Sequence, residues 1–144
     1  MKKILFIALL SVLGLSTYAR GKQPITFQKL PQAVQEAVLA NFEQSQIQLI
    51  TSEKTMPKRY KYVFNMADGT KLECNNKAQL RKVTNKNGIK EVFVPENILT
   101  YVRETFPNAT ITEYKKETMK QQIELNDKMD LIFSSKGRFI RIDD

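Results

Sequence analysis

Apolar residues recur at helical spacing in two separate stretches of the chain. In the first stretch, LPQAVQEAVLANF, Val34, Val38 and Phe42 stand four residues apart, and this period places their side chains on one face of an α-helix. The second stretch, VPENILTYVRETF, begins at Val94 and has the same pattern. Each has a proline after its first apolar residue, where a helix loses nothing by the missing N–H. The pattern predicts two amphipathic helices.

Four short runs after the first helix are typical of β-strands. They cover residues 47–55, 59–66, 71–75 and 80–84. In the second run, Tyr60, Tyr62 and Phe64 alternate with other residues and so share one strand face. These aromatics can form either a binding stripe or the core side of a sheet, and the alternation favours the core side. Asp68-Gly69, between the second and third runs, favours a tight hairpin turn. We therefore expect an antiparallel meander.

The second half of the chain repeats this order. When Pro31 is aligned with Pro95, the same offset carries the alignment into the first strand, where Ile47 meets Ile111. Beyond a shorter hairpin loop near Thr118 the offset becomes smaller, so that Phe64 meets Ile123, and apolar residues again align with apolar residues. Chance similarity between two helices would not extend through four strands. The sequence therefore predicts one unit built twice, over residues 25–86 and 90–144.

The predicted fold is α+β, a tandem repeat of a helix followed by a four-stranded antiparallel meander. A unit of about 60 residues is marginally stable alone, so two such units are expected to share a core. Both helices would then pack on one face of the sheet. Residues 20–24 are predicted as a short polar lead-in, and the pattern leaves open whether the two units form one continuous sheet.

The first nineteen residues have the pattern of a signal peptide. Lys2 and Lys3 precede ILFIALLSVLGL, a largely apolar run of twelve residues, and Thr17 and Ala19 supply the small residues of a cleavage site. The run is shorter than the roughly 20 apolar residues that span a membrane. No cysteine follows it directly, so no lipid anchor is expected. We predict a signal peptide at 1–19 and a mature chain of residues 20–144, periplasmic or secreted, with no membrane span.

The charge of the chain favours anionic partners. The net charge is +8, or +6 without Lys2 and Lys3, and a basic protein attracts acidic surfaces. The basic residues are scattered along the chain, so nucleic acid is not an expected partner. Binding of a small or polyanionic envelope ligand remains an alternative function.

The sequence offers little catalytic equipment. It has no histidine and one cysteine, Cys74, which excludes Ser–His pairs and thiolate metal sites. Cys74 alternates with Leu72, so we expect a buried thiol. Asp127 and Asp130 are candidates for an acid–base pair or a cation site, but their spacing does not match a calcium loop. Because turns recruit Asp for their own backbone bonds, we favour a turn role and predict no enzyme, no cofactor and no metal site.

These features together resemble a known family. An apolar–Pro helix start, a helix ending in Phe, a DG turn and a closing GRFIRID, doubled in an exported chain, are similar to the PepSY-like proteins of Bacteroidetes, which are also described as beta-lactamase-inhibitor-like. The resemblance covers nearly all of residues 25–144. The chain departs from it at Ala78, where the family has Gly, and at NDKM, which replaces the second Asp-Gly.

The resemblance implies a sheet surface that binds another protein. In the related inhibitor architecture a concave sheet holds an enzyme, and PepSY modules in protease propeptides are thought to restrain a peptidase. Beta-lactamase inhibition by this chain follows only from analogy of fold. We expect an exported, non-catalytic binding module that engages another envelope or extracellular protein, such as a peptidase, and inhibits or regulates it. The oligomeric state is left open.

The expected binding surface is the sheet face opposite the helices. Strand alternation predicts that this face mixes charged and apolar groups, as non-obligate interfaces do. A solvated sheet face of no binding function would have the same mixture. The predicted face carries Lys61, Val63, Asn65, Lys71, Glu73, Arg81, Val83, Gln122, Glu124, Ile132, Ile140 and Ile142. The first eleven form the candidate partner-binding site.

Overall fold

The computed structural model describes residues 21–126 and 128–143. The predicted signal peptide and Asp127 lie outside the described residues. The first half contains β1 (Lys22–Pro24), the 3-10 helix η1 (Phe27–Lys29), α1 (Gln32–Leu39), η2 (Gln44–Gln46), β2 (Ile47–Met56), β3 (Arg59–Met66), β4 (Lys71–Asn75) and β5 (Leu80–Thr84). The second half contains η3 (Glu91–Phe93), α2 (Glu96–Thr105), β6 (Ile111–Lys116), β7 (Lys120–Leu125), β8 (Met129–Ser134) and β9 (Phe139–Asp143).

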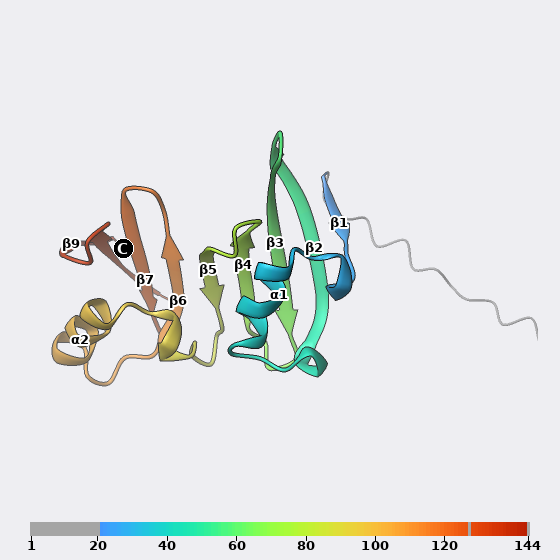
Figure 1. Ribbon diagram of the computed structural model, residues 1–144. Helices are drawn as coiled ribbons and strands as arrows, with labels where there is room; N and C mark the ends of the chain where they lie inside the picture. The colour runs from blue at the N-terminus through green and yellow to red at the C-terminus, as the bar shows by residue number, and fades with distance from the viewer. Residues whose placement is uncertain (1–20, 127, 144) are drawn as a thin grey trace, which may run out of the picture.

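The nine strands of the described chain form one antiparallel sheet, in chain order from β1 to β9 (Figure 1). The predicted α+β class is confirmed. Strands β5 and β6 pair directly, with Val83 opposite Tyr114, so the sheet is continuous across the two halves. The prediction for residues 20–24 was incomplete, because β1 adds an edge strand there and Gln23 pairs with Ser52 of β2.

A row of directly paired apolar residues crosses the sheet and forms the centre of the core. Its members are Ile50, Phe64, Leu72, Val83, Tyr114, Ile123 and Leu131, each at most 5% exposed. Val34 of α1 and Ile98 of α2 belong to the same core cluster. We call the side of the sheet that carries this row the helix face and the opposite side the far face. One core thus runs under both helices.

The aromatic stripe of β3 lies on the helix face, as the alternation predicts. Phe64 is fully buried and Tyr62 is 6% exposed, whereas Tyr60 is 38% exposed near the end of the hairpin. Tyr60 and Tyr62 stack with their ring centroids 6.4 Å apart. The stripe therefore belongs to the core at one end and to the surface at the other.

Backbone irregularities recur at equivalent positions of the two halves. The β2–β3 register shifts after Ile47, and the β6–β7 register shifts after Ile111, which the sequence aligns with Ile47. The β4–β5 register shifts after Glu73, and the β8–β9 register shifts after Ile132. The alignment of the two halves matches Glu73 with Ile132. Both helices begin after a proline of nearly identical backbone angles, with φ −53° in the first and φ −55° in the second. The irregular features of the sheet are repeated along with the regular ones.

The departure from glycine at Ala78 is accommodated in a left-handed turn. Ala78 has φ 60°, and the equivalent Gly137 has φ 79°. A Cβ atom at Gly137 would lie 2.2 Å from the side-chain nitrogen of Asn97, so a larger residue there would displace the Asn97 side chain. In the first half, the Asn75 side chain accepts backbone hydrogen bonds from Lys77 and Gln79, both 3.0 Å long. These bonds offset a left-handed strain of about 1–2 kcal/mol.

Truncation of either central aromatic is expected to destabilise the whole domain. Phe64 and Phe133 are both fully buried in the one core, so Phe64→Ala and Phe133→Ala should each lower the free energy of unfolding by about 3–5 kcal/mol. Urea denaturation measures the change. Met119→Ala is the control, since Met119 is 79% exposed and should change stability by less than about 0.5 kcal/mol. A loss confined to one half of the chain would contradict a shared core.

Candidate functional site on the far face

Most of the predicted binding residues lie on the far face. Val63, Glu73, Gln122 and Ile132 belong to one row of paired residues that alternates with the core row, and Asn65, Lys71 and Glu124 belong to the next row. Lys61 lies on the same face, opposite Glu53 and Asn75. Val63 and Ile132 are nevertheless only 5% and 2% exposed.

The prediction was wrong for Val83 and Arg81. Val83 is fully buried in the core row. The reason is a bulge in β5, where Glu73 pairs with Lys82 but Cys74 pairs with Leu80. Arg81 is the extra residue of this bulge, and it lines a groove of the helix face beside Phe93 and Tyr114. A bulge redirects one side chain and reverses the alternation beyond it.

The second half contains the equivalent bulge, with the same consequence. Ile132 pairs with Arg141 while Phe133 pairs with Phe139, so Ile140 is the extra residue. Ile140 is 52% exposed and, as the extra residue, has no partner in the far-face row, so its predicted place in that row was wrong. Ile142 pairs with Leu131 of the core row, so its placement on the far face was also wrong.

Ion pairs neutralise much of the far face. Lys61 lies 2.9 Å from Glu53, and Lys82 lies 2.9 Å from Glu113. The hydrogen bond from Lys61 lowers the pKa of the Glu53 carboxyl. Within the described ranges, Lys71 has no carboxylate within ion-pair distance. Lys71 is therefore an unpaired cation on a face of mostly paired charges.

A polar groove of about 470 Å³ lies on the far face where the two halves meet. We call it the far-face groove. Its walls come from β3, β4 and β5 of one half and β6 and β7 of the other. It is lined by Asn65, Asp68, Gly69, Lys71, Thr84, Asn85, Lys86, Asn87, Thr112, Glu113 and Glu124. Three of these, Asn65, Lys71 and Glu124, were predicted from the sequence.

One buried side chain fixes the end wall of this groove. The Asn85 amide donates hydrogen bonds to the Thr70 hydroxyl at 3.0 Å and to the Asp68 carbonyl at 3.3 Å. Its oxygen accepts a 2.9 Å bond from the backbone N–H of Asn87. The turns at 67–70 and 85–88 are thereby held together. The groove offers donors, acceptors and charges of both signs, which suits a polar segment of a protein partner.

The described acidic residues at one end of this face lie along a single cross-strand row. Asp130 pairs with Glu124 and Asp143 in one cross-strand row, and Arg141 contacts Asp143 at 2.7 Å. In residues 21–126 and 128–143, no group of three or more Asp, Glu, Cys or His side chains is placed to hold a metal ion. Asp130 is thus part of a strand ladder rather than of the turn itself.

A family model matches both halves of the chain. The model, described as "Putative beta-lactamase-inhibitor-like, PepSY-like", matches residues 17–82 and 58–141. The two overlapping matches agree with the doubled pattern of the sequence. Comparison with curated proteins gave no match.

Three solved structures share the fold. A "putative calcium-regulated periplasmic protein" from Bacteroides thetaiotaomicron has a TM-score of 0.77 and 23% identity, covering 85% of this chain and 97% of its own. A putative periplasmic protein from Bacteroides vulgatus has a TM-score of 0.77 and 23% identity, covering 88% of this chain and 100% of its own. A second putative periplasmic protein from that organism, of unknown function, has a TM-score of 0.77 and 22% identity. The match covers 86% of this chain and 100% of its own. None of the described helices is long and apolar enough to cross a membrane.

Cys74 is buried, as the sequence predicts. Burial raises the pKa of its thiol to about 12 from a usual 9.0. We expect iodoacetamide at pH 8 to react with the native protein roughly a hundredfold or more slowly than with the urea-unfolded chain, because the thiolate is the nucleophile. Since the folded pKa is the higher one, the neutral thiol stabilises the fold below pH 9, and this contribution is lost as the pH rises toward 12.

Alkylation rates measured by mass spectrometry test this prediction. The double variant Cys74→Ala, Ser45→Cys carries its thiol at an exposed position and should react equally fast folded and unfolded. Equal rates for Cys74 in the two states would show that the thiol is accessible.

Proposed function

Because the chain belongs to the PepSY-like, beta-lactamase-inhibitor-like family, we propose that it is an exported, non-catalytic binding module of the cell envelope. On this proposal the signal peptide is removed and the mature chain acts in the periplasm or outside the cell. Its partner is another envelope or extracellular protein, such as a peptidase, which it inhibits or regulates. The periplasmic proteins that share the fold support this location.

The far-face groove is the observation that carries the proposal. It combines residues of both halves with the unpaired cation Lys71, and three of the eleven predicted residues line it. The bulges remove Arg81 and Val83 from the binding surface. The revised surface consists of Lys61, Asn65, Lys71, Glu73, Gln122 and Glu124, with Lys82, Thr84 and Glu113 added.

The duplication explains why such a groove exists. We propose that each unit is one helix followed by one four-stranded meander, joined edge to edge through β5 and β6. The repeated bulges and proline helix starts support a shared origin of the two units. A groove at their joint forms only in the doubled protein, since one unit supplies Lys71 and the other supplies Glu124.

Photocrosslinking in the cell that makes the protein tests this surface. The photoreactive residue p-benzoylphenylalanine at position 71 should give crosslinked adducts with one or a few envelope proteins. The same residue at position 33, an exposed site on α1, is the matched control and should give none of these adducts. Asn65→Arg fills the groove next to position 71 and should lower the adduct yield about tenfold, as expected when a well-packed contact is lost.

Two results would contradict the proposal. Adducts of equal yield at positions 33 and 71 would show that contact is not specific to the far face. Adducts at position 71 that are unchanged by Asn65→Arg would show that the far-face groove is not occupied. Circular dichroism of Asn65→Arg confirms that the variant is folded.

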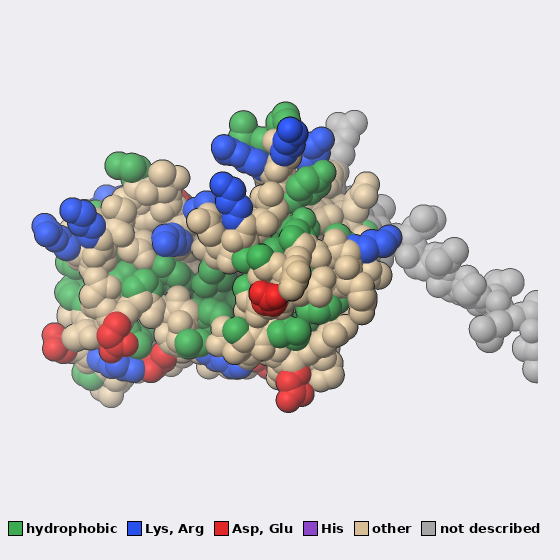
Figure 2. Space-filling view, viewed as in Figure 1, with side chains coloured by type: hydrophobic (Ala, Val, Ile, Leu, Met, Phe, Trp, Pro, Cys, Tyr) green, Lys and Arg blue, Asp and Glu red, His purple; other side chains and the backbone are tan. Residues whose placement is uncertain are grey.

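A second candidate function rests on the distribution of charge. The loops that join β2–β3, β4–β5, β6–β7 and β8–β9 lie at one end of the antiparallel sheet, which we call the hairpin end. Figure 2 shows Lys and Arg side chains gathered there. Its cations are Lys58, Arg59, Lys77, Lys116, Lys120, Lys136 and Arg138. This end suits a polyanionic envelope ligand, the alternative that the net charge favours.

Retention on heparin resin tests the polyanion alternative. The wild-type mature chain should elute at a salt concentration that falls clearly when Lys58→Ala and Arg59→Ala are combined, because fewer counterions are then released on binding. Lys29→Ala with Lys90→Ala removes the same charge from the region of α1 and η3 and should change elution less. If both double variants lower the elution salt concentration equally, retention depends on net charge alone and not on the hairpin end.

A further inference from the structure

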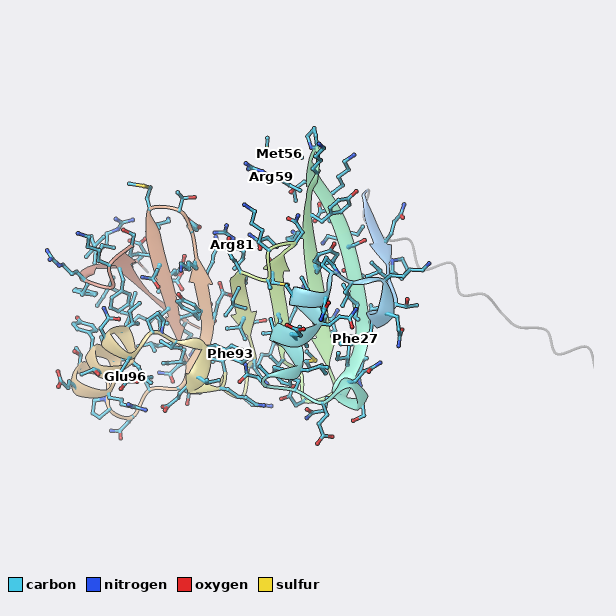
Figure 3. The ribbon with its side chains drawn as sticks, in the orientation of Figure 1. Phe27, Met56, Arg59, Arg81, Phe93 and Glu96 are labelled. Atoms are coloured by element: carbon cyan, nitrogen blue, oxygen red, sulfur yellow. The ribbon has the colours of Figure 1, made fainter. Side chains whose placement is uncertain are left out.

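A second groove lies on the helix face, at the joint between the halves. Strands β5 and β6 are paired only from Lys82 to Thr84, and beyond Lys82 they separate toward the hairpin end (Figure 1). The groove at this point has a volume of about 500 Å³. It is lined by Gln79, Leu80, Arg81, Phe93, Tyr114, Lys116, Glu117 and Thr118. In Figure 3, Arg81 lies above Phe93 along this joint.

A smaller apolar cavity lies next to the groove, between α1 and the sheet. This cavity has a volume of about 170 Å³. It is lined by Ala37, Val38, Asn41, Phe42, Phe64, Leu72, Cys74, Ala78, Leu80 and Phe93. Leu80 and Phe93 line both spaces, so the two are neighbours, and we infer that they form one channel with an apolar inner end and a polar mouth. Figure 2 shows hydrophobic side chains in the recess between the two lobes of the molecule.

Comparison of the two halves explains the apolar inner end. In the second half, three aromatic rings fill the space between α2 and the sheet, with Tyr101 stacked 4.8 Å from Phe139 and in edge contact with Phe133 at 5.5 Å. In the alignment of the two halves, Tyr101 corresponds to Ala37 of the first half. Phe133 corresponds to Cys74, and Phe139 corresponds to Leu80. These smaller side chains line the inner cavity. The first half is therefore open where the second is filled.

The mouth of the channel carries two unpaired cations. In the described parts of the chain, neither Arg81 nor Lys116 has a carboxylate within ion-pair distance. Arg81 reaches only the side-chain oxygen of Gln79, at 3.5 Å. Glu117 lies at the mouth too, but it is 2.6 Å from Lys115. Two uncompensated cations above an apolar channel provide charge complementarity for one anionic head group.

We propose that this channel binds a medium-chain fatty acid. The acyl chain occupies the inner cavity beside Phe64 and Leu72, and the carboxylate lies between Arg81 and Lys116. An extended peptide is disfavoured in the inner cavity, because its backbone amides would lack hydrogen-bond partners against the apolar walls there. This site is separate from the far-face groove, so it does not depend on the proposed protein partner.

Binding of dodecanoate below its critical micelle concentration tests the proposal. Isothermal titration calorimetry of the mature chain should give saturable binding of one ligand per chain. Amide resonances of Leu80 and Phe93 should shift in NMR spectra during the titration. Dodecanol and dodecyltrimethylammonium, which have the same chain without a carboxylate, should bind at least about tenfold more weakly, a difference of one decade in Kd.

Two sets of variants separate the head-group site from the acyl site. Arg81→Ala combined with Lys116→Ala should raise the Kd for dodecanoate at least about tenfold, whereas Lys77→Ala, an exposed cation of the same end, should leave it unchanged. Ala37→Tyr restores the ring found at Tyr101 and should abolish binding by filling the inner cavity. Because Ala37 is exposed on α1, the variant is expected to fold, and circular dichroism checks this.

Several outcomes would overturn the proposal. Absence of saturable dodecanoate binding to the wild type would do so, and so would dodecanol binding as tightly as dodecanoate. Binding that survives Ala37→Tyr in a folded variant would place the ligand elsewhere. Resonance shifts produced by an apolar peptide but not by dodecanoate would assign the channel to a protein ligand.

Discussion

The structure depends on the pairing of β5 with β6. Three residue pairs join these strands, and they connect two units that are each too small to bury a full core. The central pair is Val83 and Tyr114, which are fully buried and 3% exposed, respectively. Through this pair the apolar row of the first unit continues into that of the second. The joint therefore turns two marginal units into one hydrophobic core.

The same joint also creates both grooves. On the helix face, the border between the units stays open beside Leu80 and Phe93. On the far face, the border brings Lys71 of one unit near Glu113 and Glu124 of the other. Opposite faces of one joint thus present an apolar channel and a polar groove.

The periodicity of the sequence was enough to predict most of the fold. Burial of one side of a regular strand or helix imposes a fixed period on the apolar residues. This period was enough to predict the four strands of the first unit, the start of each helix and the alignment of the two halves. The edge strand β1 was missed because a three-residue strand carries too few positions to show a period. Its pairing with β2 depends on a neighbour that is distant in the sequence.

The far-face site was predicted only in part, because alternation fails at a bulge. In LRKVT, Leu80 and Val83 stand three residues apart, and an ideal strand cannot place both on one face. This odd spacing was the available signal for the bulge, and FIRI in the second unit shows it again with Phe139 and Ile142. Assignments made by simple alternation were therefore wrong at the two bulges and right where the ladder is regular, as at Asn65; the wrong assignments are Arg81, Val83, Ile140 and Ile142.

The two units differ in what occupies the space beneath the bulge, and this difference makes the molecule asymmetric. Both units have the bulge, but its extra residue is Ile140 in the second and Arg81 in the first. The space beneath it is filled by aromatic rings in the second unit, whereas the first has only Ala37, Cys74 and Leu80 there. Packing alone favours the filled arrangement, since an unfilled cavity costs stability. An open channel with a cation at its mouth is therefore the property that distinguishes the first unit from the second, and it is the difference that a ligand would explain.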